Sequence, residues 1–499
     1  MFQARLTTHS SYGLIADLMK KRFREPEDDG VPEAVKRLKL EIRKASPSLP
    51  VDFQKITGPS HAIYCNRPFE IATIPLVLHH EAFGIFKDRC LLPPSKPAIA
   101  CLNELAPTAC MWYGREMQRR DAVLNVLRRH LGLVFHAEKV PGTEYITDGN
   151  LTAVVMPPSI RECKNEEGNP LNQATLYYLN FLTSALDRPE NFYNFDTCFP
   201  CILLVDMGMS APLPTFHFLL IYSGSYFAFY GALWDGNRVR VESLTPAFDL
   251  ATHGRESKTR NAIASSFDAL QLAVENIRAH YSKIEAEARV NPAPKPYNRR
   301  LQKARNFPFV TSYVDDGQQT SFRYVERLDE GRLLFSALVN DDRQADCIVK
   351  FTQQYSEAAH LCLAFYHSAP TLRHCTKISA EWTAVVMDRS MYKMLYGLSL
   401  TKDQQEKVRR KVEKTLQVLH DAGFVHGDLR NTNILIDLES LDSDDLRIHF
   451  VDFDWAGRIG EAEYPVDINR ITVKRPEGAE GGKLITVEHD KVMVSYLFT

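Results

Sequence analysis

The segment Leu419–Ile436 reads LHDAGFVHGDLRNTNILI, and Val451–Asp454, reading VDFD, follows a short distance later. Polar side chains occupy defined places in it: Asp428, then Asn433 five positions on, then Asp452. Phosphoryl transfer needs a carboxylate near the acceptor hydroxyl, and an amide and a second carboxylate that hold Mg²⁺ on the phosphates. The alternative is an ordinary helix, turn and strand capped by these residues. A motif of this length is far more specific than a short pattern, so the stretch predicts a phosphotransferase.

The order and spacing resemble the catalytic loop and metal-binding segment of the protein kinase superfamily. The resemblance implies a compact protein-kinase-like fold, with ATP and Mg²⁺ as ligands. Asp428 would orient the acceptor hydroxyl, and Asn433 and Asp452 would be the metal ligands. Arg430 stands where serine/threonine kinases usually have a lysine that contacts the transferred phosphate, and it keeps the charge with a different geometry.

Further kinase elements are expected upstream. The strand Cys347–Phe351 presents Lys350, which we expect to contact the α- and β-phosphates of ATP. Glu357, on a predicted helix, would pair with Lys350. Met387, near the end of Trp382–Asp388, lies where the adenine ring would stack. Each of these residues could instead be a surface charge or a buried strand end.

The segment departs from the kinase pattern at several positions. The expected glycine-rich nucleotide loop contains only Gly331, so backbone amides offer little cover for the phosphates. Gly427 replaces the arginine that reads a phosphorylated activation loop, and Asp454 replaces the glycine after Phe453. The short C-terminus leaves room for one helix near His489. A His-Gly-Asp variant also occurs in aminoglycoside-type phosphotransferases, so the acceptor could be a protein or a small-molecule hydroxyl.

Composition gives the general class. The chain has 499 residues, 44% of them hydrophobic, which suggests two to four domains with sizeable cores. Its 60 basic and 62 acidic residues nearly cancel, so any nucleic-acid site must be local. We expect no secretion signal, no membrane span and reduced thiols, and we interpret Cys198 and Cys201 as partly buried thiols rather than a metal or redox pair.

The chain divides at Asn291–Pro296, where proline at alternate positions fixes φ and removes hydrogen-bond donors. We predict a basic N-terminal segment (1–50), an α/β domain (51–288), a Pro-rich linker (289–308) and the kinase-like domain (309–499). Lys20–Arg22 and Lys36–Lys39 resemble a bipartite nuclear-import signal. A solvated amphipathic helix is an equal alternative for the second, so the expected location is the nucleus or otherwise the cytoplasm.

A second constellation lies in the α/β domain. Asp148 precedes Glu162-Cys163-Lys164, and strand alternation puts Glu162 and Lys164 on one face and Cys163 on the other. Two carboxylates on neighbouring strands can hold a divalent cation, and a nearby lysine can serve the attacking water in phosphodiester hydrolysis. A surface hairpin with a cross-face ion pair is the alternative.

This pattern resembles the PD-(D/E)xK restriction-endonuclease-like fold. The resemblance implies Mg²⁺ or Mn²⁺ held by Asp148, Glu162 and Glu116, and adds Gln173 to the site. Thr147 replaces the family's proline. Partner DNA is expected to contact local basic side chains on the predicted helix Met111–Leu131, namely Arg119, Arg120, Arg128 and Arg129.

The two halves together resemble the Crinkler-related effector class of fungi and other eukaryotes, which pairs a nuclease with a short kinase. The expected fold class is α/β followed by α+β. We expect an ATP-dependent serine/threonine-kinase-like phosphotransferase fused to a metal-dependent nuclease, an effector or transposon-derived protein acting inside cells. The alternative is a non-catalytic DNA-binding scaffold with degenerate nuclease and pseudokinase domains. The sequence gives no oligomeric state.

Overall fold

The computed structural model describes residues 63–65, 73–164, 169–188, 195–207, 225–290, 305–315, 317–340 and 344–498. Three predicted features lie outside these ranges: the two basic segments and the alternating prolines of Asn291–Pro296. None of the helices in the described ranges is long and apolar enough to span a lipid bilayer.

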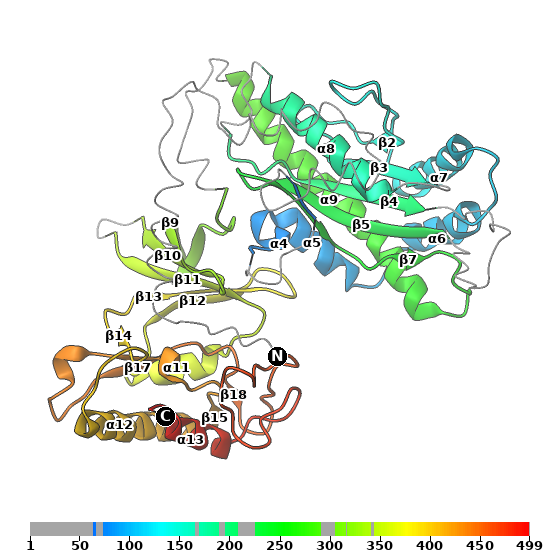
Figure 1. Cartoon of the computed structure of the whole chain (residues 1–499). Helices are drawn as coiled ribbons and strands as arrows, with labels where there is room; N and C mark the ends of the chain where they lie inside the picture. The colour runs from blue at the N-terminus through cyan, green and yellow to red at the C-terminus, as the bar shows by residue number, and fades with distance from the viewer. Residues whose placement is uncertain are drawn as a thin grey trace, which may run out of the picture.

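The N-terminal half is built on one mixed sheet of seven strands (Figure 1). Its order is β1-β6-β5-β4-β3-β2, with β7 paired to β5. β3 runs parallel to β4 and antiparallel to β2. The strands are β1 (Ile63–Cys65), β2 (Gly149–Asn150), β3 (Ser159–Lys164), β4 (Cys201–Met207), β5 (Tyr226–Trp234), β6 (Val239–Ser243) and β7 (Phe248–Asp249).

Helices pack around this sheet. The helix predicted from Met111 begins only at Glu116, and it ends at Gly132, whose φ of 65° allows the left-handed cap. Asn169 caps the helix that carries Gln173, through its side-chain oxygen. The helices are α4 (Leu76–His79), α5 (Glu81–Cys90), α6 (Lys96–Ala109), α7 (Glu116–Leu131), α8 (Pro170–Leu186) and α9 (Ser257–Val290). α8 packs on β3 and β4, while α7 also contacts β3.

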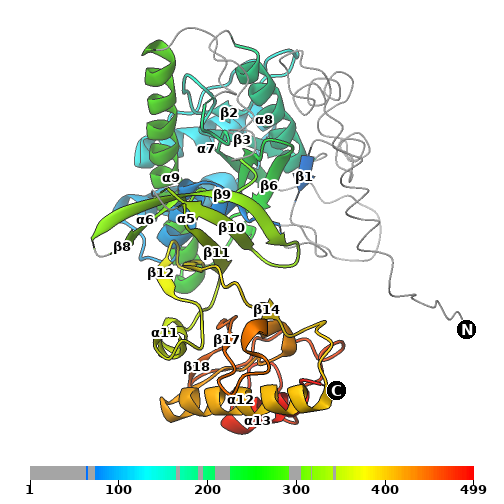
Figure 2. The same cartoon turned by 90° about the vertical axis from the view of Figure 1, so that its left-hand side faces the viewer.

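The C-terminal half consists of a six-stranded sheet above a lobe of helices, small sheets and loops (Figure 2). The sheet order is β12-β13-β11-β10-β9-β8. Its elements are β8 (Ser312–Asp315), β9 (Gln318–Asp329), β10 (Leu334–Val339), β11 (Asp346–Thr352), α11 (Glu357–Phe365), β12 (Leu372–Lys377) and β13 (Thr383–Asp388).

The lower lobe contains two helices and two small sheets. Thr401 and Gln404 form a capping box that begins its long helix, whose buried positions Val408, Val412, Leu416 and Leu419 recur at helical spacing. The elements are β14 (Lys393–Met394), α12 (Lys402–Asp421), β15 (Phe424–Val425), η2 (Asn431–Asn433), β16 (Ile434–Ile436), η3 (Leu438–Ser440), β17 (Ile448–Phe450), β18 (Gly457–Arg458) and α13 (Val487–Ser495).

The two halves touch at described residues. Lys87 of α5 forms an ion pair with Glu381, and the amide of Ala380 donates to Asp88. Arg305, inside the predicted linker, is buried and donates to backbone carbonyls of Phe195 and Thr197. This end of the predicted linker therefore packs on the N-terminal half. The domain boundaries themselves stay a prediction.

Candidate functional site

The predicted catalytic loop, residues 426–433, follows β15, and Asp490 of α13 holds its first two residues. The two carboxylate oxygens of Asp490 accept the backbone N–H groups of His426 and Gly427, each at 2.8 Å, and His420 lies 3.1 Å away. Gly427 has a φ of 79°, and a Cβ there would lie 2.7 Å from a methyl carbon of Ile485. This conformation favours glycine, and the turn directly precedes Asp428.

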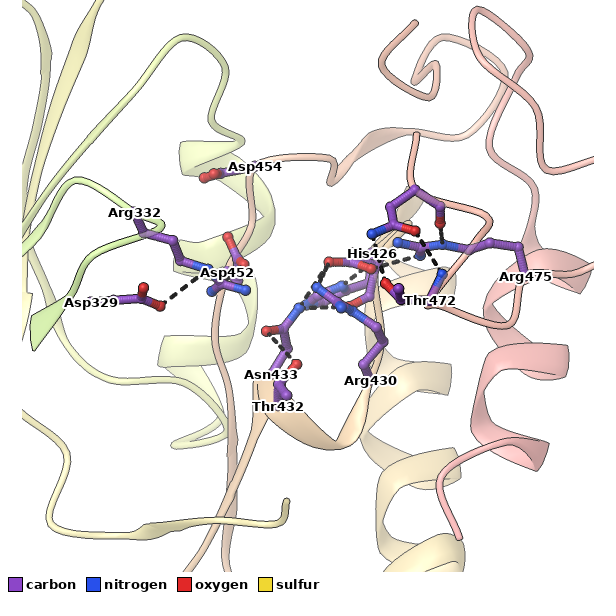
Figure 3. A network of polar contacts seen from close by, with 12 residues as sticks. Asp329, Arg332, His426, Arg430, Thr432, Asn433, Asp452, Asp454, Thr472 and Arg475 are labelled. Atoms are coloured by element: carbon purple, nitrogen blue, oxygen red, sulfur yellow. Dashed lines mark hydrogen bonds and ion pairs between the residues drawn. The ribbon is translucent and has the colours of Figure 1, made fainter. Parts of the chain in front are cut away.

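Both carboxylate oxygens of Asp428 accept hydrogen bonds. Figure 3 shows the three residues whose side chains donate to it, Arg430, Asn433 and Arg475. Oδ1 accepts from Arg475 at 2.6 Å, and Oδ2 accepts from Arg430 at 2.7 Å. The side-chain amide of Asn433 donates to the Asp428 carbonyl at 2.8 Å and to Oδ2 at 3.1 Å. The structure thus brings together three residues that the sequence selected, and it adds Arg475.

Asp452 follows β17 and lies next to this loop, because the amide of the preceding Val451 donates to the carbonyl of Asn433 at 3.0 Å. Lys350 Nζ contacts Asp452 at 2.5 Å and Asp454 at 2.6 Å, and Arg332 contacts the other oxygen of Asp452 at 2.8 Å. Asp452 has a φ of 70°, a left-handed conformation unusual for a residue with a side chain. Such strained positions are found preferentially at functional sites.

Burial and charge shift the pKa values here in opposite directions. Burial alone would lower the pKa of Lys350, but Asp452 and Asp454 outweigh it and hold that pKa above its ordinary value. Burial opposes ionisation of Asp452 too, yet Lys350 and Arg332 keep its pKa well below the usual range. Burial raises the pKa of Asp454 to about 6, with Asp452 adding to the rise and Lys350 opposing it. Asp452 is therefore the ionised carboxylate available to a metal.

The predicted pair between Lys350 and Glu357 does not form. Glu357 begins α11 directly after the capping Ser356, and its side chain is exposed. Asp454 takes the place of that partner, because it stands in the segment that already brings Asp452 to the lysine. The expectation for Glu357 as a partner of Lys350 was wrong in this conformation.

Met387 lies on β13, opposite Ile348 of β11, and is buried. A separate cavity of about 660 Å³ opens beyond the end of this strand, lined among others by Asp388, Tyr392 and His449. None of the predicted catalytic residues lines it. The cavity is therefore not the site formed by Lys350, Asp428 and Asp452.

The N-terminal constellation also gathers. Lys164 Nζ contacts Glu116 of α7 at 3.1 Å. The backbone amide of Asp148 donates to Glu162 at 3.2 Å, and Asp148 accepts the amide of Cys163 at 3.0 Å. Potential ligand atoms of Glu116, Asp148 and Cys163 lie within 4.8 Å of one another.

Cys163 is the residue that sequence reasoning missed, because alternation was expected to turn it away from the acids. Burial raises the pKa of its thiol, so the thiol stays protonated and is a poor metal ligand. Glu162 is fully buried, and its Oε2 has no hydrogen-bond partner among the described residues. Burial, followed by the charge of Asp148, raises the pKa of Glu162 well above its ordinary value. A divalent cation between these carboxylates would supply the missing partner, so the residues present fit one.

Gln173 lies beside this group rather than in it. Its amide donates to the hydroxyl of Tyr177 at 2.6 Å, while its buried Oε1 has no hydrogen-bond partner in the described part of the chain. Tyr177 in turn is close enough to Glu162 for the carboxylate charge to contribute to the raised pKa of its hydroxyl, after burial. Gln173 thus contacts the site through one intervening side chain.

One expected DNA contact was wrong. Arg119 is buried and pairs with Asp206 at 2.6 Å, and Arg161 from β3 pairs with the other oxygen of the same carboxylate. Consecutive arginines on a helix had suggested one basic surface, but only Arg120, Arg128 and Arg129 reach solvent. Arg119 instead fixes α7 to the sheet.

The match to a family model agrees with the C-terminal geometry. No curated protein matches the sequence. Among solved structures, a Cydia pomonella granulovirus kinase, PK-1, is 16% identical with a TM-score of 0.25, covering 28% of this chain and 53% of its own. Vaccinia related kinase 3 is also 16% identical, with a TM-score of 0.28 over 38% of this chain and 68% of its own. This chain thus spans about half the length of the granulovirus kinase. Residues 376–467, which include the catalytic loop, match the lipopolysaccharide kinase (Kdo/WaaP) family, and the C-terminal region is a kinase-like domain.

Proposed function

We propose that the C-terminal domain is a Mg²⁺-dependent kinase that transfers the γ-phosphoryl group of ATP to a protein hydroxyl. The observation that carries the proposal is the juxtaposition of Asp428, bound to Asn433, with Asp452, bound to Lys350. A kinase-like domain uses ATP, and phosphoryl transfer depends on positioning and charge neutralisation rather than on covalent chemistry by the protein.

The residues divide the chemistry between them. Asn433 and Asp452 would hold Mg²⁺, which neutralises the phosphates when bound. Lys350 would then exchange one of its carboxylate partners for a phosphate oxygen. Asp428 accepts the proton of the acceptor hydroxyl, whose oxygen bonds to the γ-phosphorus as the bond to the β-phosphate oxygen breaks and ADP leaves.

In this proposal Arg332 contacts the phosphates of ATP, a role that the backbone amides of a glycine-rich loop would otherwise have. The amide of Gly331 donates to Asp329 at 2.7 Å, so the single glycine of the turn is already committed. The guanidinium of Arg332 extends from that turn to Asp452 and would move to the phosphates once a metal occupies the carboxylate. A planar cation of this kind suits phosphate oxygens.

The full chain, labelled ATP and a whole-cell extract test the proposal. Asp428→Asn and Asp452→Asn should each abolish transfer while the fold survives. The matched control is Asp421→Asn, an exposed aspartate at the end of α12. Turnover near the wild-type rate in either site variant, with ATP and Mg²⁺ saturating, would refute the assignment.

We propose, second, that the N-terminal domain is a metal-dependent nuclease of the PD-(D/E)xK type. Its support is the convergence of Glu116, Asp148, Glu162 and Lys164 from α7, the loop before β2, and β3. Asp148, Glu162 and Glu116 would hold Mg²⁺ or Mn²⁺, and Lys164 would orient the attacking water. DNA would contact Arg120, Arg128 and Arg129 through its phosphates.

Variants of the full chain separate these roles. Lys164→Ala should remove cleavage of plasmid or single-stranded DNA but leave Mn²⁺ binding, whereas Asp148→Ala should remove both. Lys139→Ala, an exposed lysine paired with Glu144, is the control. Absence of both cleavage and metal binding in the wild-type protein would leave a non-catalytic DNA-binding scaffold as the better proposal. Cleavage of RNA instead would change the substrate only.

We also propose that the protein belongs to the Crinkler-related effectors of fungi and acts in the nucleus or cytoplasm. The support is the pairing of the two constellations in one chain, with the basic segments Lys20–Arg22 and Lys36–Lys39 ahead of them. Nuclear accumulation of a fluorescent fusion, lost when Lys36–Lys39 becomes alanine, would support the nuclear location. Retention of nuclear signal in that variant would argue against these segments.

A further inference from the structure

Arg475 closes the acceptor side of the kinase-like site. Its side chain is only 3% exposed and its guanidinium contacts Asp428 at 2.6 Å. The same guanidinium lies 4.8 Å from the ring centre of Trp455, and its Nε donates to the Asn469 carbonyl at 3.3 Å. The side chain of Arg475 is thus fixed by its contacts with Asp428, Trp455 and Asn469.

The segment that carries Arg475, residues 465–483, is anchored at its base, and we call it the acceptor loop. Tyr464 donates its amide to the Lys483 carbonyl and accepts from Gly482, both at 2.9 Å. Beneath it, Ala462, Tyr464, Ala479 and Ile485 form a small buried cluster with Val425 of β15. The loop is therefore a built wall of the site.

Positive charge exceeds negative charge at this wall. Asp428 is one carboxylate, yet it contacts the two guanidinium groups of Arg475 and Arg430. Nε of Arg430 is buried and has no hydrogen-bond partner among the described residues. A buried donor without a partner is costly, so Arg430 favours an anion, which is the transferred phosphate in the proposed reaction. Arg475 is then the cation that remains for an anion beside the acceptor hydroxyl.

A neutral hydroxyl offers no charge in exchange for these ion pairs, so it would share the oxygens of Asp428 with the two arginines. A carboxylate or phosphate next to the hydroxyl can take over Arg475 and leave Oδ1 of Asp428 free to accept the proton. Val466 and Ile471 of the acceptor loop are 92% and 98% exposed, which gives a polypeptide apolar contacts beside the charge.

Resting on the proposed kinase activity, we propose that the acceptor is a polypeptide hydroxyl flanked by acidic residues, and that Arg475 selects it by exchanging Asp428 for the acceptor's carboxylate. Arg475 is then a specificity-determining residue as well as the group that covers Asp428 before the acceptor binds.

The test uses the full chain with Mg²⁺, ATP and three peptides that share a central serine flanked by Glu, Ala or Lys. The wild-type kcat/KM should favour the Glu peptide over the Ala peptide about tenfold, and the preference should decline as salt screens the charges. Arg475→Gln should reduce that ratio below about threefold, and Arg475→Lys should retain part of it. Arg470→Gln, in the same loop but paired with Glu480, is the matched control and should keep the ratio.

The outcomes separate this inference from the proposed function. Equal use of the three peptides by the wild type would overturn the inference alone. An equal increase of kcat/KM for all three peptides in Arg475→Gln would also overturn the inference, since Arg475 would then only cover Asp428. No transfer and no ATP turnover in any of the proteins would overturn the proposed kinase activity and, with it, the inference. Thermal melting of each variant shows whether a lost ratio comes from a lost fold.

Discussion

Asp490 offers the sharpest test of how the catalytic loop is held. Its carboxylate is completely buried and accepts the amides of His426 and Gly427 while lying 3.1 Å from His420. Asp490→Asn keeps the shape but converts one acceptor oxygen into a donor. At least one of the two backbone N–H groups then faces another donor in the interior.

The magnitude follows from those contacts. A buried donor without a partner costs about 1–3 kcal/mol, and a hydrogen bond to a charged group contributes about 1.5–3 kcal/mol. We therefore expect Asp490→Asn to destabilise the kinase-like region by about 2–4 kcal/mol, equivalent to a melting point roughly 5–15 °C lower. Because Asp428 follows Gly427 directly, displacement of the loop should also reduce kcat about 100-fold.

Thermal unfolding of the full chain with and without Mg²⁺ and ADP identifies the transition of the kinase-like region, since a ligand of the folded state raises its midpoint. Glu488→Gln, on the same helix and 75% exposed, is the control and should change stability by at most about 1 kcal/mol. A melting point within about 2 °C of wild type for Asp490→Asn, with unchanged kcat, would refute this account of the loop.

Three further changes have expected outcomes. Arg332→Ala should raise the KM for ATP about 10–100-fold, measured by steady-state kinetics. Arg323→Ala, on the exposed side of β9, is the control and should leave that KM unchanged. An equal KM for ATP in the two variants would show that Arg332 is not part of the nucleotide site. Glu162→Gln, melted in EDTA, should be more stable than the wild type at about pH 8 by about 1–3 kcal/mol. The reason is that burial raises the pKa of Glu162, so ionisation of this carboxyl costs stability in the fold. The gain in stability should fade as pH falls through that pKa, and a gain independent of pH would contradict this account. Burial lowers the pKa of His79 and His80 to about 3, so their contribution is lost as pH falls through the ordinary histidine value. At about pH 5, urea unfolding should show that the free energy of unfolding has decreased by about 2 kcal/mol per histidine. In His79→Leu the free energy of unfolding should decrease less steeply as pH falls. An unchanged dependence on pH would show that His79 is not the titrating group.

Local sequence was enough to locate the elements and several of the interacting residues. The spacing of Asp428 and Asn433 places both in one tight turn, so their contact was predictable without a structure. The ExK pattern likewise falls on a strand, and Gln173 on the helix that follows it. Cys198 and Cys201 are both buried, more completely than the partial burial that the sequence predicted.

Partners distant in sequence were not predictable from local pattern. Lys350 and Asp454 are 104 positions apart, whereas Glu357 was the nearer acid, so proximity in sequence suggested the wrong partner. Arg475 reaches Asp428 from 47 positions away in a loop without periodic pattern. For Arg119 a signal did exist: Asp206, near the end of an otherwise apolar strand, requires a buried cation.

Gly427 has a consequence for how such an enzyme could ever be regulated. Kinases that respond to phosphorylation of their own activation segment read it with an arginine at this position, and here any side chain would meet Ile485 at 2.7 Å and Trp455 at 3.1 Å. An arginine at position 427 would also strain the backbone, whose φ is 79°, so a single codon change would install that sensor only at a cost to the loop. Control of this catalytic loop by an upstream kinase through that arginine would therefore require changes around position 427 as well as at it.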